Sequence, residues 1–329
     1  MIITKGKIEF HVDDNGKLCK MVNTTNSRTN VVIPKKLGAD IDIHIIGSEF
    51  CVGRYSKITI SNKIRNIEDK AFKNADVAAV QWSAGCLDIP FECFYNSKIM
   101  RITNIHNVQV IFKDAFAHSK IFKFNWPAKC KTIPQGCFSD SFLTFISGTE
   151  DVESILYGAF SFCQLKSFHW PEKCKTVPEN CFRGTKVSSI SGLDEVETIN
   201  DGAFSLTYIE ELAWPTKCRR IPNDCFRGSQ LNKISNTQNV NEIGDMAFCG
   251  TNIEEITWPH ECISVPKGCF CDSTLKTICN IENILYIGVG AFNNTNPINL
   301  NFSSSPILNV GDKAFEGVDM DKVTLPYYY

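Results

Sequence analysis

The chain has 329 residues, with 34 lysines and arginines against 36 aspartates and glutamates, which gives a formal net charge of −2 at pH 7. This near balance excludes a global electrostatic field that would attract nucleic acid or an anionic membrane. No apolar run approaches the roughly 20 residues of a membrane-spanning helix, and the segment Met1 to Ile8 lacks the layout of a signal peptide. We therefore expect a soluble protein with no transmembrane segment and no nucleic-acid partner.

The first predicted element is an N-terminal cap. Apolar and polar residues alternate from Ile8 to Val12, and the triplet Asp14-Asn15-Gly16 is a strong turn signal before the apolar segment Leu18 to Val22. This pattern predicts a β-hairpin. Since a polar link follows at 23–30, we expect residues 1–30 to form a hairpin cap and link that covers the first open edge of the next domain.

From residue 31 the sequence repeats with a fixed period. A phenylalanine anchor recurs every 22 residues, and the last of 13 anchors follows a one-residue insertion. Apolar residues stand 17, 14 and 12 positions before each anchor, as in Leu165, Phe168 and Trp170. The spacing predicts a short strand in each turn and a β-rich solenoid of about 13 turns of 22 residues over 31–326, with 327–329 as a C-terminal tail. The anchors are Phe50, Phe72, Phe94, Phe116, Phe138, Phe160, Phe182, Phe204, Phe226, Phe248, Phe270, Phe292 and Phe315.

Alternate turns carry a longer motif, so a second period of 44 residues overlies the first. The motif is Trp-Pro-x-x-Cys, and it begins at Trp126, Trp170, Trp214 and Trp258, with a copy that lacks the proline at Trp82. The intervening turns carry asparagine or glycine at the tryptophan position: Asn104, Gly148, Gly192, Asn236 and Asn280. We interpret this alternation as volume compensation, in which each large ring leans over the space left by its small neighbour.

Ten of the sixteen cysteines occupy two repeat positions. They stand eight residues or one residue before an anchor, where alternate turns carry valine, isoleucine or alanine. A position that accepts these residues is an apolar core position, so buried thiols are the favoured interpretation. Disulfides within a turn remain an alternative. A metal site is disfavoured because equivalent cysteines lie two turns apart, roughly 9 to 10 Å at strand spacing, which is too far to share one zinc ion.

The repeats resemble the treponemal, or BspA-like, class of leucine-rich repeat proteins. Clear examples are Ile253-x-x-Ile256-x-Trp258-Pro259 and Val240-x-x-Ile243-Gly244-x-x-Ala247-Phe248. The resemblance covers Val31 to Pro326 and implies a leucine-rich repeat solenoid with a parallel β-sheet on the concave face. It also implies short 3-10, irregular or β segments on the convex face. Proteins of this class are surface or secreted adhesins and protein-interaction scaffolds.

No catalytic constellation is evident in the sequence. The six histidines are scattered, the glycines form no phosphate-binding loop, and a cysteine position that recurs five times is a poor match to a catalytic residue. We therefore expect no enzyme activity, no cofactor and no metal site.

The candidate binding surface is the outward face of the strands, 16, 15 and 13 residues before each anchor. In the earlier turns these positions combine exposed aromatic and basic residues, and the predicted partner-binding residues are Arg101, Phe122, Lys123, Phe145 and His169. An exposed phenylalanine beside lysine or arginine is typical of an interface hot spot, although an ordinary solvated sheet face would also fit. The later turns are more acidic, with Glu210, Glu211, Lys233, Glu254 and Glu255.

These observations predict a non-catalytic protein-binding module, adhesin-like or exposed at the cell surface, whose partner is a host or matrix protein. The alternative is an intracellular scaffold or regulatory subunit, which the absence of a visible signal peptide and the buried-thiol interpretation favour. The state of the cysteines separates the two hypotheses, because free thiols are typical of the cytosol and disulfides of exported proteins.

Overall fold

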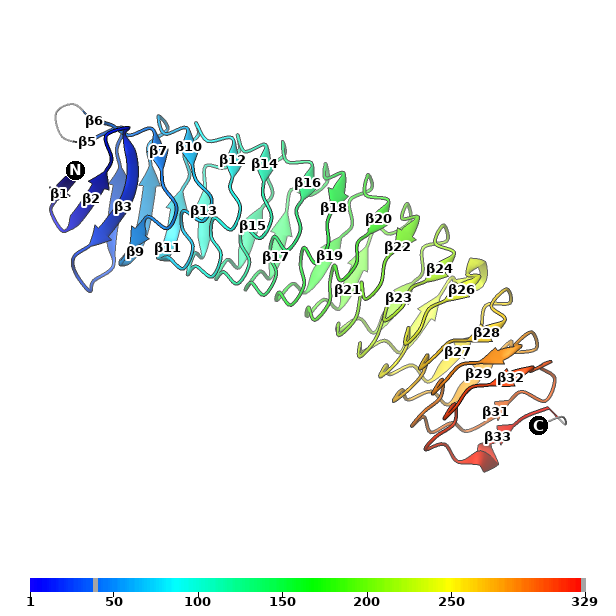
Figure 1. Cartoon of the computed structure of the whole chain (residues 1–329). Helices are drawn as coiled ribbons and strands as arrows, with labels where there is room; N and C mark the ends of the chain where they lie inside the picture. The colour runs from blue at the N-terminus through cyan, green and yellow to red at the C-terminus, as the bar shows by residue number, and fades with distance from the viewer. Residues whose placement is uncertain (38–40, 327–329) are drawn as a thin grey trace. The chain divides into compact units, whose positions relative to one another are not determined.

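The computed structural model describes residues 1–37 and 41–326. It divides into two compact units, Met1–Leu165 and Lys166–Tyr329. Within each unit the strands are stacked in chain order (Figure 1), and both units are β-solenoids with a repeat of 22 residues. The predicted tail at 327–329 lies outside the described residues.

The first unit contains β1 (Ile2–Lys5), β2 (Ile8–Val12), β3 (Lys17–Asn23), β4 (Thr29–Ile33), β5 (Lys36–Leu37), β6 (Ile41–Asp42), β7 (Ile45–Ile46), β8 (Cys51–Val52), β9 (Arg54–Ile60), β10 (Asn66–Ile67), β11 (Asp76–Gln81), β12 (Asp88–Ile89), β13 (Arg101–Thr103), β14 (Val110–Ile111), β15 (Lys123–Asn125), β16 (Thr132–Ile133), β17 (Phe145–Ser147) and β18 (Ser154–Ile155).

The second unit contains β19 (Ser167–His169), β20 (Thr176–Val177), β21 (Ser189–Ser191), β22 (Thr198–Ile199), β23 (Glu211–Ala213), β24 (Arg220–Ile221), β25 (Lys233–Ser235), the 3-10 helix η1 (Thr237–Asn239), β26 (Glu242–Ile243), β27 (Glu255–Thr257), β28 (Ser264–Val265), β29 (Thr277–Cys279), β30 (Tyr286–Ile287), β31 (Leu300–Asn301), β32 (Asn309–Val310), the 3-10 helix η2 (Met320–Lys322) and β33 (Val323–Thr324). Neither η1 nor any other helix in the described part of the chain has the length and apolarity to cross a membrane.

The N-terminal hairpin is present and carries an additional strand. β2 and β3 pair antiparallel, as the turn signal predicts, and β1 pairs antiparallel with the outer edge of β2. β3 also runs parallel to β7 and β8, so the hairpin is hydrogen-bonded to the first turns of the repeat. The division of the chain at residue 30 stays a prediction.

Each full turn contributes two strands to two different sides of its unit. We call the outward side of β9, β11, β13, β15 and β17, and of β19, β21, β23, β25, β27 and β29, the strand face. The two-residue strands lie on the opposite side of the turn sequence, where β12 pairs with β14 and β16 with β18 in parallel. Because paired residues are 22 apart, the register keeps equivalent residues of adjacent turns side by side.

The strands pair two by two from β15 onward, rather than in the unbroken ladder that stacking alone predicts. In the pairs β15–β17, β19–β21, β23–β25 and β27–β29, a strand of a tryptophan turn pairs with the strand of the turn after it. β11 and β13 pair in the same way within a four-stranded sheet. The 44-residue period of the sequence is therefore also the period of the hydrogen bonding.

The anchor phenylalanines form an internal column in each unit. In the first unit the rings of Phe94 and Phe116 are stacked with centroids 5.3 Å apart, and those of Phe116 and Phe138 are 5.5 Å apart. In the second unit Phe226 and Phe248 are stacked at 5.8 Å. All five rings are fully buried, which confirms the predicted core.

The Trp-Pro-x-x-Cys motif is a hydrogen-bonded turn. The backbone N–H of Cys130 donates to the Pro127 carbonyl over 2.9 Å, and the Trp126 indole N–H donates to the Cys130 carbonyl over 2.9 Å. The indoles of Trp214 and Trp258 make the same bond at 3.1 and 3.0 Å. The motif therefore satisfies a buried indole while it turns the chain at the end of a strand.

Backbone conformation, rather than side-chain volume, accounts for the residues that alternate with tryptophan. Asn104, Gly148, Gly192, Asn236 and Asn280 all have a left-handed backbone, with φ between 62° and 78°. Glycine and asparagine tolerate this conformation better than other residues. The Asn280 amide also donates to the Trp258 carbonyl over 2.7 Å. This finding corrects the volume interpretation.

Candidate functional site

The geometry of the strand face follows from the alternation of side chains along each short strand. In β15 the central residue Phe124 is buried, whereas Lys123 and Asn125 on either side are exposed. Successive side chains of a strand point to opposite faces. The positions 15 and 13 residues before each anchor therefore form two outward rows, as the sequence predicts.

Three of the predicted binding residues occupy one of these rows in the first unit. Arg101, Lys123 and Phe145 are the first residues of β13, β15 and β17, and all three are exposed. Lys123 and Phe145 are direct partners in the parallel register of β15 and β17. The phenylalanine keeps 52% of its surface exposed although it lies within a sheet. A cation and an aromatic ring thus lie side by side on the surface.

Phe122 lies immediately before β15 and is 40% exposed. Its carbonyl accepts two hydrogen bonds from Thr144, one from the backbone N–H at 2.9 Å and one from Oγ1 at 2.8 Å. The backbone is therefore held in place while the ring remains at the surface. Such a pre-positioned aromatic side chain loses little conformational entropy when it binds.

His169 belongs to the second unit, where it is the last residue of β19. Its Nδ1 lies 2.9 Å from Oγ of Ser191, its partner in the register of β19 and β21. The structure therefore brings Arg101, Phe122, Lys123 and Phe145 together in the first unit and places His169 in a different unit, within a polar pair of its own.

The structure adds a phenylalanine that sequence reasoning missed. Phe142 stands 18 residues before its anchor and is 49% exposed. The Lys120 ammonium lies over its ring, 3.8 Å from the centroid, in a cation–π contact. Met100 is also exposed and precedes β13 as Phe122 precedes β15. The signal was present in the sequence, because the position 18 residues before an anchor also faces outward, but only three outward rows were considered.

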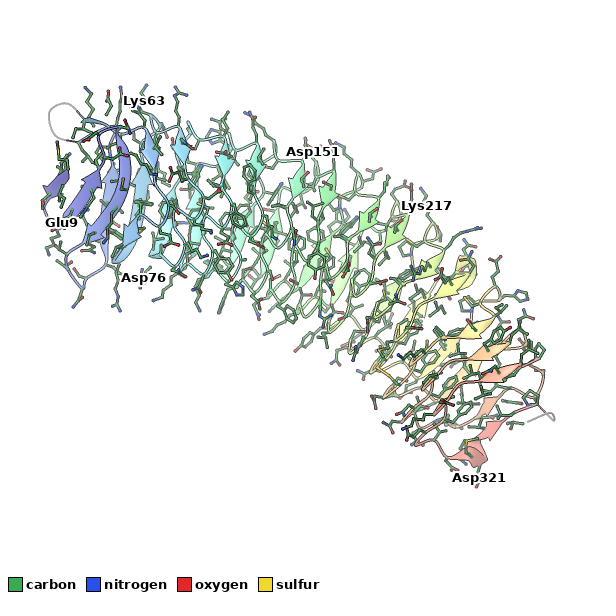
Figure 2. All side chains as sticks on the ribbon, in the orientation of Figure 1. Glu9, Lys63, Asp76, Asp151, Lys217 and Asp321 are labelled. Carbon is green, nitrogen blue, oxygen red and sulfur yellow. A yellow bond between two sulfur atoms is a disulfide. The ribbon has the colours of Figure 1, made fainter. Side chains whose placement is uncertain are left out.

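A carboxylate at the edge of the same face holds three cations. Asp76, labelled in Figure 2, forms ion pairs with Arg28, with Arg54 at 3.7 Å and with Lys98 at 2.9 Å. Burial opposes ionisation, but the hydrogen bond from Lys98 and the charges of Arg28, Lys98 and Arg54 outweigh it and lower the pKa of Asp76. This group is an internal ion network, so its cations are already partly neutralised.

The strand face of the second unit has a different charge pattern. Glu211 pairs in register with Lys233, and Glu254 accepts an ion pair from Lys276 at 2.7 Å. A groove of about 970 Å³ lies over β25 and β27. Its lining includes Lys233, Glu254, Glu255 and Asn280. Opposite charges alternate along this face, so it presents no field of a single sign.

The repeat cysteines are core residues without reactive character. Burial raises the pKa of Cys86 to about 11 and those of Cys130, Cys218 and Cys262 to about 12. Burial also raises the pKa of Cys93 well above its usual range. These groups are thiols at neutral pH, whereas a nucleophile or a zinc ligand must be a thiolate.

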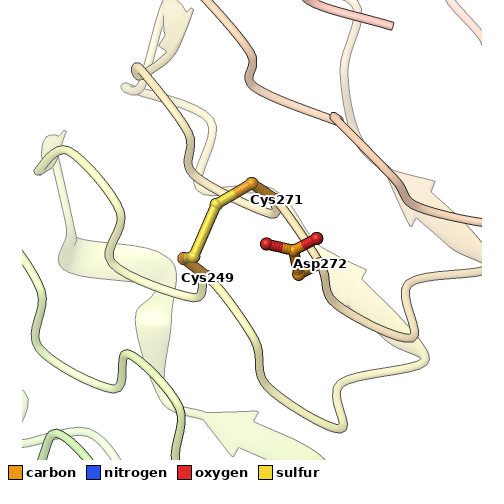
Figure 3. A group of neighbouring side chains, drawn as sticks. All are labelled: Cys249, Cys271 and Asp272. Carbon is orange, nitrogen blue, oxygen red and sulfur yellow. A yellow bond between two sulfur atoms is a disulfide. The ribbon is translucent and has the colours of Figure 1, made fainter. Parts of the chain in front are cut away.

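One pair of cysteines outside the repeat positions is bridged. Cys249 and Cys271 form a disulfide with Cα atoms 4.7 Å apart (Figure 3). The bridge joins adjacent turns, since residues 22 apart lie side by side, so the expectation of disulfides within a turn is wrong for this pair. Cys249, Cys271 and Asp272 have their ligand atoms within 4.8 Å of one another. With the two sulfurs bonded together, only the Asp272 carboxylate would remain for a cation.

Comparison with protein families gives one match. The model of the BspA type leucine rich repeat region matches six copies, over residues 27–144, 131–252 and 197–321. These ranges cover most of the chain and agree with the repeat described above. No curated protein matches the chain.

Solved structures share the fold. A leucine-rich repeat protein from Bacteroides ovatus is similar with a TM-score of 0.76 and 18% identity, over 96% of this chain and 92% of that protein. A leucine rich cell surface protein from Faecalibacterium prausnitzii is similar with a TM-score of 0.52 and 17% identity, over 95% of this chain and 94% of that protein. At such low identity the similarity concerns the architecture alone.

Proposed function

Because the chain belongs to the BspA-type leucine-rich repeat family, we propose that it is a non-catalytic protein-binding module that binds through its strand face. The observation that supports this proposal most directly is the group of exposed side chains on adjacent turns of the first unit. Lys123 and Phe145 are neighbours in register, and Phe122 precedes the same strand. Repeat proteins commonly bind partners on such extended faces.

The proposal includes an adhesin-like role at a cell surface, with a host or matrix protein as the partner. One similar structure is described as a cell surface protein. The disulfide between Cys249 and Cys271 supports the same role, because stable disulfides are typical of oxidising compartments. The buried thiols of the repeat positions favour the alternative, an intracellular scaffold or regulatory subunit.

The binding proposal is tested by capture of partners from a lysate or a matrix extract with the whole chain as bait. The variant Phe122→Ser with Phe145→Ser should retain less of each specific partner, because aromatic anchors carry much of the energy of an interface. A matched control is Tyr208→Ser with Leu206→Ser, which removes two exposed apolar residues of the second unit. Undiminished capture by the first variant would refute the assignment of this face.

The compartment is tested separately on protein purified from its native source. Alkylation before and after reduction counts bridged cysteines. A bridged Cys249 and Cys271 would support the surface role, and reduced thiols at both positions would support the intracellular alternative.

A further inference from the structure

We propose that the exposed cations and apolar side chains of the first unit bind an acidic segment of a protein partner, one in which carboxylates flank an apolar side chain. This inference rests on the proposed function and specifies the chemistry of the partner. We define the basic–aromatic patch as the residues Arg101, Lys120, Lys123, Phe122, Phe142 and Phe145.

The charge of the strand face in the first unit is strongly one-sided. Along the outward positions of β9 to β17 and the residues just before these strands, six lysines and arginines face a single carboxylate, Asp76. The six cations are Arg54, Lys57, Lys98, Arg101, Lys120 and Lys123. This local excess contrasts with the chain's overall net charge of −2. Such a field attracts anionic groups and raises the association rate of an acidic partner.

The cations of the patch are the ones that remain available. Arg54 and Lys98 are paired with Asp76, and Lys57 donates to the Gln81 side chain at 2.8 Å. Arg101, Lys120 and Lys123 form no ion pair among the described residues. A carboxylate arriving at the patch would therefore meet uncompensated positive charge.

The apolar part of the patch lies among these free cations. Phe122 immediately precedes Lys123 in sequence, and Phe145 is paired with Lys123 in register. A partner that covers the rings must also cover the lysine, so burial of the rings leaves the lysine in need of an opposite charge. An acidic side chain beside an apolar one satisfies both requirements together.

The same contacts favour a protein over a single-stranded nucleic acid. Nucleic-acid surfaces of this kind use open aromatic faces on which bases stack. The Lys120 ammonium covers one face of the Phe142 ring. The ring edges and the neighbouring cations fit a protein segment with side chains of both kinds better than a row of stacked bases.

The test measures binding of short fluorescein-labelled peptides to the whole chain by fluorescence anisotropy at low salt. One peptide alternates glutamate with leucine and glycine, a second replaces the glutamates with lysine, and a third replaces the leucines with serine. A labelled oligothymidylate is the fourth probe. The glutamate–leucine peptide should bind most tightly of the four, and added salt should weaken its binding.

Charge reversal locates the interaction on the patch. Arg101→Glu with Lys123→Glu should weaken the glutamate–leucine peptide about 100-fold, on the estimate of roughly tenfold for each reversed charge. The control Lys166→Glu with Lys186→Glu makes the same change of charge at exposed positions of the second unit, and it should alter the affinity less than about threefold. Circular dichroism confirms that both variants are folded.

Three results would overturn the inference: equal affinity for the glutamate and lysine peptides, equal loss in the two charge-reversed variants, or tighter binding of the oligothymidylate. The partner capture described above separates this failure from that of the proposed function. If Phe122→Ser with Phe145→Ser lowers capture while no acidic peptide binds, the face stands and the acidic partner is refuted. If capture is also unchanged, both are refuted.

Discussion

Replacement of Phe182 by alanine tests the idea that the anchor column holds the turns together. The Phe182 ring is fully buried in the second unit. Its centroid lies 5.5 Å from that of Phe168, 6.1 Å from that of Trp170 and 6.1 Å from that of Phe204. The substitution therefore removes a ring that contacts its own turn and the next turn.

The expected loss in the free energy of unfolding is about 3 to 5 kcal/mol, the usual cost of a buried phenylalanine-to-alanine change. It combines lost burial of the ring, the cavity that remains, and aromatic pairs worth roughly 0.5 to 1.5 kcal/mol each beyond burial. Because each turn is stabilised mainly by its neighbours, the adjacent turns should also loosen. A reduced dependence of unfolding on denaturant would show this.

Urea unfolding followed by tryptophan fluorescence is a suitable assay, since Trp170 and Trp214 are both buried in the second unit. Phe145→Ala is the matched control, because its ring is exposed and its loss should change stability by less than about 0.5 kcal/mol. A loss below about 1 kcal/mol in Phe182→Ala, or an equal loss in the control, would refute the column as the main source of stability.

Three further predictions concern the backbone, the ion network and the cysteines. Gly192→Ala should cost about 1 to 2 kcal/mol in a melting experiment, since Gly192 has φ 78° and a Cβ there would lie 2.8 Å from the Trp170 carbonyl; Asn236→Gly is the control with little effect. The lowered pKa of Asp76 means that its stabilising contribution is present above pH 3.8 and is lost as pH falls through the folded-state pKa. The stability difference between wild type and Asp76→Asn should therefore shrink in acid, and a constant difference would contradict the ion network. Native alkylation should modify the exposed Cys19 and Cys279 first and leave Cys130 unmodified, because burial raises the pKa of Cys130 to about 12; equal rates would contradict its burial.

The fold could be predicted from the sequence because the same information is repeated in every turn. A single apolar triplet such as Leu165, Phe168 and Trp170 is ambiguous, but its recurrence at a fixed distance from the anchors leaves few alternatives. The cysteine positions became interpretable in the same way, through the valine and alanine of alternate turns. Buried Cys93 and Ala115 occupy equivalent places in the core.

The alternation of tryptophan with asparagine or glycine needed backbone angles that the sequence does not contain. Both volume and conformation predict a small residue opposite tryptophan, and only the positive φ of Asn104 and Gly148 separates them. The Cys249–Cys271 bridge was missed for a different reason. Neither cysteine falls on a repeat cysteine position, so the comparison that identified the buried thiols did not include them.

The candidate site was predicted in part, because outward rows are readable from the period whereas their grouping is not. Arg101, Lys123 and Phe145 were placed in one row by counting from the anchors, and the structure has them there. The sequence also joined His169 to this group, although it lies in the second unit. Counting along the chain shows which face a residue occupies but not where one compact unit ends.

The inner positions of every turn are occupied for structural reasons that the contacts identify. The anchors fill the core, the tryptophans bond to the carbonyl of their motif cysteine, and the left-handed residues turn the chain. None of these requirements extends to the outward rows, where Lys123 and Phe145 are exposed and support no buried contact. A costly exposed ring at such a position is therefore better explained by a partner than by the fold, and the same reasoning explains why the cations beside it are unpaired. The binding specificity of this solenoid should accordingly be transferable by exchange of outward residues alone, and grafting Arg101, Phe122, Lys123 and Phe145 onto the equivalent outward positions of the second unit should create a second acidic-peptide site there; a correctly folded graft with no additional binding would show that the outward side chains are not sufficient.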